Sequence, residues 1–319
     1  TSLYRTDARP GFHPLMAMML ISVPALLRAT TSLEFFYCWE IITLASYFLI
    51  AQGRSSGPHI QCFLLFSLGS AFLLLAGFAL AAAANGSIEL AAFRTAGPDT
   101  TVAVLLLGMG FLIKAGAVGV HVWLPDAYAE ADDDVSAILS SVISKVAIFG
   151  LLAATYMVIR SGLGLNMAAV MGWIGLMTTL AGALMALYQT DLKRMLACSS
   201  MSQLGYIVTA IVLMSHLGWV TAFYLVDNHL MVKGILFLAA AGIVLRTGTR
   251  SLDDLGGLAR NMPFSFFTVV FALVAMSGLP PLMGFGGKWL LLSAMTDKGL
   301  YGQLVVGLLV TFIGFLYMA

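Results

Sequence analysis

Long apolar runs separated by short polar connections dominate the sequence. Each run approaches the length of about 20 residues that lets a helix cross a bilayer. Lipid cannot hydrogen-bond a bare backbone, and the runs lack the alternation of barrel strands, so we expect helices. The predicted membrane segments are Leu15–Ala29, Leu33–Ala51, Ile60–Ala84, Thr101–Trp123, Val135–Val158, Met167–Tyr188, Leu196–Met214, Leu217–Leu245, Phe264–Ala294 and Tyr301–Ala319. The pattern therefore predicts an all-α integral membrane protein with about ten transmembrane helices.

Two of these segments contain residues that interrupt a helix at membrane depth. In the ninth segment Gly278 precedes Pro280 and Pro281, and two adjacent prolines remove two backbone donors. The fourth segment contains Gly116 and Gly119. Interrupted helices in corresponding halves of a chain indicate a transport site, whereas single Pro and Gly residues often only kink a membrane helix. We favour the transport interpretation for the ninth segment, while the fourth segment alone does not support it.

Composition excludes a soluble protein and gives no indication of a cofactor. Of 319 residues, 60% are hydrophobic and 10% are charged, against about 25% charged in soluble domains. The net charge is +1 and no basic tract is present, so we expect no nucleic-acid partner. The three cysteines, Cys38, Cys62 and Cys198, lie far apart without metal-binding spacing. We therefore predict neither a metal nor a cofactor, and we place any redox centre in a partner.

The ends of the sequence indicate whether the chain is complete, and the charges of the connections indicate its orientation in the membrane. The chain begins at Thr1 without an initiator Met or signal peptide and stops at Ala319 inside an apolar run, so we expect a fragment. Lys and Arg are more numerous in the even-numbered connections, when the stretch before the first segment is counted as zero. This bias predicts that the even set faces the cytoplasm of a multi-pass protein in the cell's inner (cytoplasmic) membrane.

Five ionisable residues lie near the middle of predicted segments: Glu40, Lys114, Lys145, Lys233 and Lys288. Each costs about 2.5–3.5 kcal/mol at the bilayer centre, so they should face a hydrated interior lined by protein. The alternative is a set of salt bridges that only fixes helix packing. One acid cannot neutralise four lysines, so that alternative explains at most one of them. Burial without a partner favours the neutral amine, and a series of such lysines is what a proton relay needs.

Two histidines and one acid lie near these lysines. His229 precedes Lys233 by one helical turn, so both share a helix face and a histidine there can exchange protons with water. His121 follows Lys114 by seven residues and is expected near its face, although a lone membrane histidine is often a packing residue. Asp227 lies on a different face and is available to a neighbouring helix.

Several motifs resemble one membrane protein family. Gly110–Gly116 followed by His121–Ala127 resembles the seventh helix of the antiporter-like subunits of respiratory complex I, Mrp-type sodium/proton antiporters and membrane-bound hydrogenases. Further matches agree in order with the fifth, eighth, tenth, eleventh and twelfth helices of that family: Phe36–Glu40, Val135–Val146, Asp191–Tyr206, Asn228–Phe237 and Gly278–Lys288. The resemblance covers nearly the whole chain.

The resemblance implies a fold and a set of site roles. The family fold has fourteen helices with two inverted five-helix repeats, so this chain would span helices four to thirteen, with residues 1–160 in the first repeat and 161–319 in the second. Glu40 and Lys114 would form a charge pair in the first half-channel. Lys145 and His229 would lie on a central hydrated axis, and Lys288 would end the second half-channel.

Three departures from the family pattern stand out. Ala129–Asp134 replaces the usual prolines with an acidic run, which we expect to be a solvated loop, a docking site for a partner or a collector of cations at a channel mouth. Gly119 replaces a common proline, so the break in the fourth segment is expected to be softer. Cys198 replaces a usual tyrosine.

The favoured function is proton translocation through the buried lysines by a membrane subunit of a larger complex of the NADH-quinone oxidoreductase or hydrogenase type. One rival is a Na⁺/H⁺ antiporter subunit of the Mrp type, in which Asp227 or the acidic run Glu130–Asp134 helps to bind Na⁺. A second rival is a non-conducting scaffold that anchors a cytoplasmic partner. The expected partners are other membrane subunits, lipid and protons.

Overall fold

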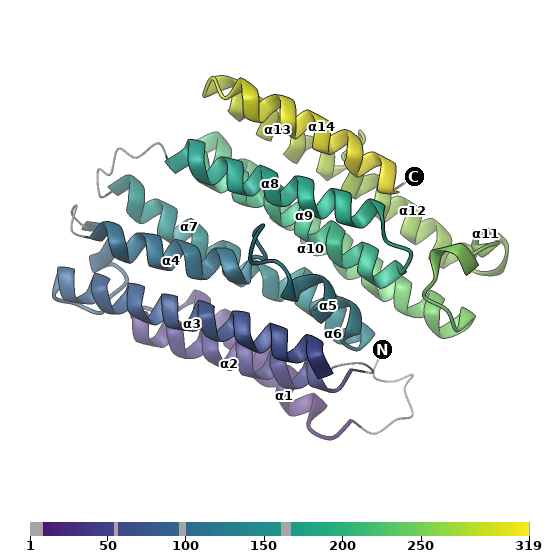
Figure 1. Cartoon of the computed structure of the whole chain (residues 1–319), viewed down its shortest axis with the longest axis horizontal. Coiled ribbons are helices and arrows are strands. Elements are labelled where there is room, and N and C mark those ends of the chain that lie inside the picture. Colours follow the sequence, from purple (N-terminus) through teal and green to yellow (C-terminus); the bar gives the residue numbers. More distant parts are fainter. Residues whose placement is uncertain (1–8, 54–56, 96–99, 161–166, 319) are drawn as a thin grey trace. The chain divides into compact units, whose positions relative to one another are not determined.

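The helices of the structure follow the predicted apolar segments. The computed structural model describes residues 9–53, 57–95, 100–160 and 167–318. The helices are α1 (Phe12–Leu27), α2 (Ser32–Ala51), α3 (Gly57–Asn85), α4 (Thr101–Lys114), α5 (Trp123–Glu130), α6 (Asp133–Ile138), α7 (Ser144–Arg160), α8 (Met167–Leu187), α9 (Leu192–Val212), α10 (His216–Thr247), α11 (Leu258–Asn261), α12 (Pro263–Ser277), α13 (Met283–Asp297) and α14 (Tyr301–Met318) (Figure 1). These ranges contain no β-strand, only two isolated bridges, so the all-α prediction is confirmed.

Within the described ranges, seven helices are long and apolar enough to cross a bilayer. They are α2, α3, α8, α9, α10, α14 and the continuous helix Asp133–Val158, which joins α6 and α7 through the π-helical segment Leu139–Ile143. Three shorter helices, α1, α4 and α12, are also apolar. The predicted multi-pass membrane protein is therefore confirmed.

Both suspected interruptions are complete breaks. The ninth predicted segment divides into α12 and α13, and Gly278 ends α12 in the left-handed conformation at φ 83°. The fourth divides as well, because α4 ends at Lys114 and α5 begins only at Trp123. Gly116 and Gly119 have positive φ between the two helices. The expectation of a softer break there is wrong, since glycine leaves the helical conformation without the steric penalty of other residues.

Polar side chains at the helix ends explain where several helices begin. Thr31 and Glu34 form a capping box at the start of α2, in which each side chain accepts a hydrogen bond from the other residue's backbone. Asp191 accepts from the Arg194 amide at the start of α9, and Ser215 caps α10 in the same way. These caps satisfy backbone donors that the first helical turn leaves without partners.

The described chain forms two compact units. The first contains α1 to α4, α7 and Glu130–Asp132, and the second contains α5, α6 and α8 to α14. In the first unit, α2 packs against α1 and α3, while α4 packs against α3 and α7. In the second unit, α9 is buried over its whole length, with α8 and α10 packed against it (Figure 1). Helix α10 also packs against α12 and α13, so these helices form the core of that unit.

Small residues allow α8 and α9 to pack closely. A side-chain carbon added to Gly205 would stand 2.6 Å from the Gly175 carbonyl oxygen, and one added to Gly175 would stand 3.0 Å from the Gly205 carbonyl oxygen. Both distances are too short for a methyl group. The two glycines therefore let the backbones approach as small residues do between membrane helices.

Each unit contains the same short backbone bridge. In the first, the Ser32 amide at the start of α2 donates to the Ile88 carbonyl, 2.8 Å away, in the segment after α3. In the second, the Leu192 amide at the start of α9 donates to the Arg250 carbonyl, 2.9 Å away, in the segment after α10. Both bridges tie the first turn of one helix to the chain that follows the next helix.

Candidate functional site

Lys114 is buried at the point where α4 breaks. Its side chain is only 8% exposed. The ammonium donates to the Thr43 hydroxyl on α2 at 3.2 Å and to the Ser67 hydroxyl on α3 at 2.9 Å. Its nitrogen also lies 4.6 Å from the centroid of the Phe63 ring, a cation–π distance. The Lys114 ammonium therefore lies between its own helix α4 and the two helices α2 and α3 that accept its hydrogen bonds.

Glu40 and Trp39 complete the surroundings of Lys114. The charges of Glu40 and Lys114 interact electrostatically. Among the described residues, the buried Glu40 Oε1 and Trp39 Nε1 atoms have no hydrogen-bond partner. Trp39, Thr43 and Lys114 also line a cavity of about 10 Å³, which is roughly the space that one water molecule needs. Buried polar atoms are almost always hydrogen-bonded, so this corner of the unit is suited to internal water.

Lys288 occupies the corresponding place at the second break. It lies on α13 and is 5% exposed. Its ammonium donates to the Ser277 carbonyl oxygen, 2.8 Å away, at the end of α12. That carbonyl belongs to the last turn of α12, where the helix carries its partial negative charge. The nitrogen also lies 5.3 Å from the centroid of the Tyr206 ring. The Lys288 ammonium therefore lies at the broken backbone between α12 and α13.

Lys233 is the most deeply buried of the four lysines, at 0% exposure. Its ammonium donates to the Leu196 carbonyl at 2.8 Å and forms a short hydrogen bond with the Ser199 hydroxyl, both on α9. The next residue, Ser200, shares a 2.9 Å hydrogen bond with Ser140 on the π-helical segment. A series of hydroxyl and carbonyl oxygens therefore leads from α10 across α9 to that segment.

The other two predicted relay residues lie in different settings. His229 is buried on α10, one turn before Lys233, as their spacing predicted. Lys145 is half-buried near the start of α7, and its ammonium donates to the Ser144 hydroxyl at 3.1 Å. Ser140 and Ser144 both belong to the continuous helix Asp133–Val158.

Two further charged or titratable residues are placed apart from these lysines. His121 lies between α4 and α5, and its Nδ1 accepts from the Gly119 amide at 3.2 Å. The expected shared helix face with Lys114 is wrong, because the helix ends at Lys114 and the seven-residue spacing no longer applies. Asp227 is exposed on α10, on a different face from the buried His229, as the sequence predicted.

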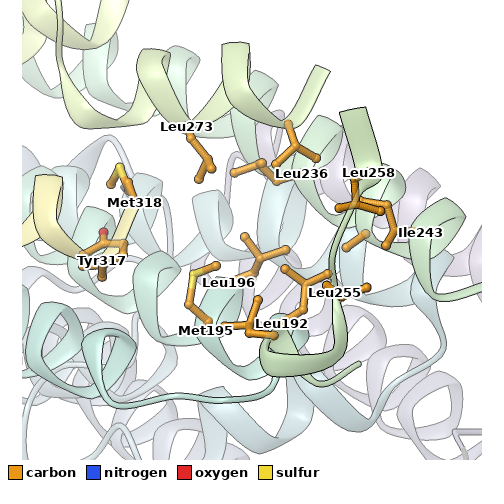
Figure 2. A pocket seen from close by; sticks show the side chains of 13 residues that line it. Leu192, Met195, Leu196, Leu236, Ile243, Leu255, Leu258, Leu273, Tyr317 and Met318 are labelled. Atoms are coloured by element: carbon orange, nitrogen blue, oxygen red, sulfur yellow. The ribbon is translucent and has the colours of Figure 1, made fainter. Parts of the chain in front are cut away.

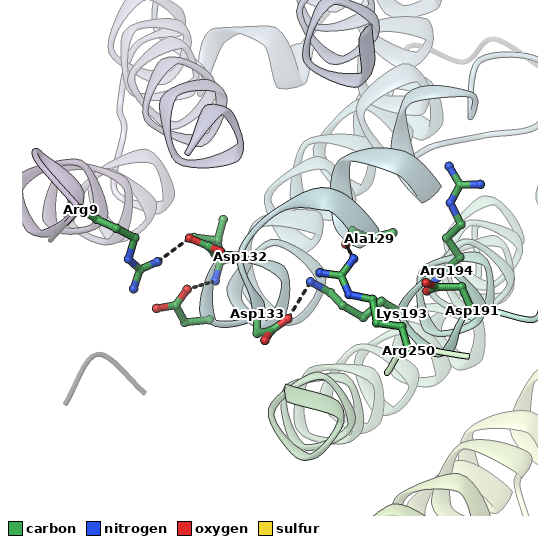
Figure 3. Close-up of polar contacts among 10 residues, drawn as sticks. Arg9, Ala129, Asp132, Asp133, Asp191, Lys193, Arg194 and Arg250 are labelled. Atoms are coloured by element: carbon green, nitrogen blue, oxygen red, sulfur yellow. Dashed lines mark hydrogen bonds and ion pairs between the residues drawn. The ribbon is translucent and has the colours of Figure 1, made fainter. Parts of the chain in front are cut away.

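The acidic run Glu130–Asp134 is not a solvated loop. Asp132 and Asp134 are buried, and the Asp132 carboxylate forms a 3.0 Å ion pair with Arg9 in the first unit. In the second unit, the Asp133 carboxylate lies 2.8 Å from the ammonium of the buried Lys193 (Figure 3). The expectation of a solvated loop is therefore wrong, because basic side chains of the same chain bind these acids.

A pocket of about 330 Å³ lies elsewhere in the second unit (Figure 2). Aliphatic side chains and Met residues make up most of its wall, with Tyr317 at one side. The lining residues are Leu192, Met195, Leu196, Leu236, Ala240, Ile243, Leu252, Leu255, Leu258, Val269, Leu273, Tyr317 and Met318. None of the predicted relay residues lines it, so we do not assign it to the site.

Several groups that bind the lysines were not among the predicted site residues. Thr43 and Ser67 hold Lys114, and Ser199, which binds Lys233, lies inside the family motif Asp191–Tyr206. The available signal was the presence of hydroxyl side chains inside otherwise apolar segments. The backbone carbonyls of Leu196 and Ser277 had no sequence signal, because which carbonyl lies near a lysine depends on helix packing.

Comparisons with known proteins agree with this architecture. Residues 29–314 match the family described as NADH:quinone oxidoreductase/Mrp antiporter, TM. The chain is 34% identical over 315 residues to NADH-quinone oxidoreductase subunit N of Desulforudis audaxviator (strain MP104C), covering 94% of this chain and 62% of the relative. It is 32% identical over 299 residues to hydrogenase-4 component B of Escherichia coli (strain K12), covering 88% of this chain and 44% of the relative.

A solved structure shows the same fold. A chain of the Mrp complex from Dietzia sp. DQ12-45-1b superposes with a TM-score of 0.88 at 29% identity, covering 96% of this chain and 58% of that chain. The chain thus spans between 44% and 62% of the length of these three relatives. From the family match and the shared fold, the chain belongs to the NADH:quinone oxidoreductase/Mrp antiporter family of transmembrane subunits.

Proposed function

We propose that this chain is the proton-translocating part of a membrane subunit in a larger complex of the cytoplasmic membrane. Protons would pass through Lys114, Lys145, Lys233 and Lys288, with Glu40 and His229 assisting. The energy would come from redox chemistry in a partner subunit or from an ion gradient. The relatives named for NADH-quinone oxidoreductase and hydrogenase support an assembly of this type.

The observation that carries the proposal is the placement of a buried lysine at each helix break. Lys114 ends α4, and Lys288 binds the carbonyl of Ser277 that the end of α12 leaves without an intrahelical donor. Interrupted helices with polar groups at membrane depth are the usual construction of a transport site. A buried lysine also favours its neutral form, so it can accept a proton and release it again.

The oxygens between the lysines supply the middle of the route. Lys233 contacts Ser199, and the neighbouring Ser200 contacts Ser140 on the helix that also carries Lys145. Hydroxyl groups both donate and accept hydrogen bonds, so they can pass a proton between amines or hold water that does so. The π-helical turn at Ser140 fits this role, because such turns are frequent at functional sites.

We further propose that residues 1–160 and 161–319 form two inverted repeats. The matching bridges at Ser32 and Leu192 support this division. The first bridge joins the connection before α2 to the one after α3, and both are odd-numbered when the stretch before the first membrane segment is counted as zero. The second bridge joins the connection before α9 to the one after α10, and both of these are even-numbered. The two bridges would therefore lie at opposite membrane faces, as inversion requires.

The rival function, a Na⁺/H⁺ antiporter subunit, is supported by the family description and by the Mrp structure, both of which name that complex. Asp132 and Asp133 are already bound by Arg9 and Lys193, so they are poor candidates for a cation site. The second rival, a non-conducting scaffold, does not explain why lysines are buried at membrane depth, and their burial therefore counts against it.

The decisive experiment replaces Lys114 in the full-length subunit within its native complex. Lys114→Ala should abolish ion-coupled activity in proteoliposomes while the complex still assembles. Lys114→Arg should fail as well, because an arginine stays protonated. Lys298→Ala, at an exposed position after α13, is the matched control and should pump normally. An assembled Lys114→Ala complex that pumps at the wild-type rate would refute the relay.

A further inference from the structure

An acid lies on the outer face of the longest helix. Asp227 is exposed on α10 and belongs to a stripe with Phe223, Met231 and Ile235, each four residues from the next. The three apolar members are 58%, 64% and 39% exposed. Residues four apart lie above one another on a helix, so the stripe is one continuous strip along α10.

The acid lies at membrane depth. Helix α10 has 32 residues, which corresponds to about 48 Å of length. Asp227 lies about 17 Å from its first residue, whereas the hydrocarbon core of a bilayer is about 30 Å thick. With α10 centred in the bilayer, Asp227 therefore falls inside the hydrocarbon region, where a carboxylate facing lipid is costly.

The described residues of the second unit supply no partner that neutralises the Asp227 carboxylate. His229 and Lys233 are buried on the inner side of α10, and Lys233 is bound to α9. Within the described ranges, no side chain forms a hydrogen bond or an ion pair with Asp227. Acids within membrane helices almost always pair with another group, so the partner of Asp227 should come from outside this part of the chain.

We propose that the α10 stripe is the docking surface for a transmembrane helix of another subunit, which carries a Lys or Arg at the depth of Asp227. The apolar members of the stripe would pack against that helix, and the charge pair would set its register. Lipid offers no cation at this depth. A second copy of the chain in a two-fold contact would place Asp227 against itself and leave both charges uncompensated. The inference rests on the proposed assembly into a multi-subunit membrane complex.

Photo-crosslinking identifies the partner directly. p-Benzoylphenylalanine replaces Phe223, one turn before Asp227, in the full-length subunit in native membranes, and the adduct is sequenced by mass spectrometry. The same probe at Phe72, exposed on α3, is the control for position. We expect a Phe223 adduct with a membrane helix of another subunit that contains Lys or Arg within one turn of the linked residue. Adducts with lipid alone, with another helix of the same subunit, or with a helix that lacks a basic residue would overturn the proposal.

A charge reversal tests the ion pair. Asp227→Lys should lower co-purification of the crosslinked subunit at least tenfold, and an acid in place of the partner's basic residue should restore it. Asp253→Lys, at an exposed position in the connection after α10, should leave co-purification unchanged. Normal co-purification of Asp227→Lys would contradict the docking surface. These readouts measure assembly, so a normally pumping Lys114→Ala variant would refute the relay without affecting them.

Discussion

Lys114, Lys233 and Lys288 each donate to at least one uncharged oxygen, a hydroxyl or a backbone carbonyl. Of these three lysines, Lys114 also interacts with a carboxylate, that of Glu40. An uncharged oxygen accepts a hydrogen bond from the ammonium and from the neutral amine alike. The lysines can therefore change protonation state without losing their positions, which is what repeated proton transfer demands.

Gly278 offers a test of how Lys288 is positioned. A side-chain carbon there would stand 2.8 Å from Lys288 Cδ, at a backbone φ of 83°. Gly248, at the end of α10, has φ 76° and nothing within 4 Å, so it shares the strain without the contact. Gly278→Ala and Gly248→Ala should each lower stability by about 1–2 kcal/mol, because a left-handed conformation penalises a side chain.

Only Gly278→Ala should also reduce proton translocation, because it displaces the Lys288 side chain. Thermal unfolding and proteoliposome pumping of both variants check this pair of outcomes. Equal pumping by the two variants would show that the position of Lys288 against Gly278 does not matter for transport.

Among the helices, the junction of α6 and α9 shows how one element stabilises another. Lys193 is 1% exposed at the start of α9, and its ammonium is held by Asp133 at the start of α6, which is 35% exposed. Acids in the first turn of a helix are favourable to the helix dipole, so Asp133 serves both elements. The acidic run thus joins elements of the fold, which explains why its acids are not free for cations.

Asp133→Asn should therefore destabilise the protein rather than change its cation dependence. Removing the carboxylate takes an ion pair away from the buried Lys193 ammonium, at a cost of about 1–3 kcal/mol. Unfolding can be followed through the reactivity of the buried Cys198 thiol. Asp254→Asn, at an exposed position, is the control and should unfold like the wild type. Unchanged stability of Asp133→Asn would show that the ion pair contributes nothing.

For the whole molecule, each membrane segment crosses the bilayer once, so successive connections lie on opposite faces. All even-numbered connections therefore share one face, and all odd-numbered connections share the other. The loop charges predict that the even-numbered connections face the cytoplasm. Asp253 lies in an even connection, between α10 and α12, and Lys298 lies in an odd one, between α13 and α14.

Cysteines at these two positions should react from opposite sides of the membrane. In a background without the natural cysteines, Asp253→Cys should be labelled by a membrane-impermeant maleimide only after the cytoplasmic face is opened. Lys298→Cys should be labelled in intact cells. The reverse pattern would invert the orientation, and labelling of both from one side would contradict the number of crossings.

The membrane segments and the central lysines were predictable from the sequence, because their causes are local. A run of apolar residues must form a helix in lipid whatever surrounds it, and a charge in such a run must face protein or water. The break at Pro280 and Pro281 was predictable for the same reason, since proline cannot donate the helical hydrogen bond. The family resemblance supplied the expected repeats.

The tertiary structure decided which groups face one another. The hydroxyls of Thr43 and Ser67 around Lys114 and the pairing of Asp133 with Lys193 depend on segments far apart in the sequence. Periodicity places a residue on a face of its own helix, but it does not say which helix packs against that face. Hydrogen bonds and ion pairs between helices form only after packing has brought their atoms within about 3 Å, so they were beyond the reach of any single segment.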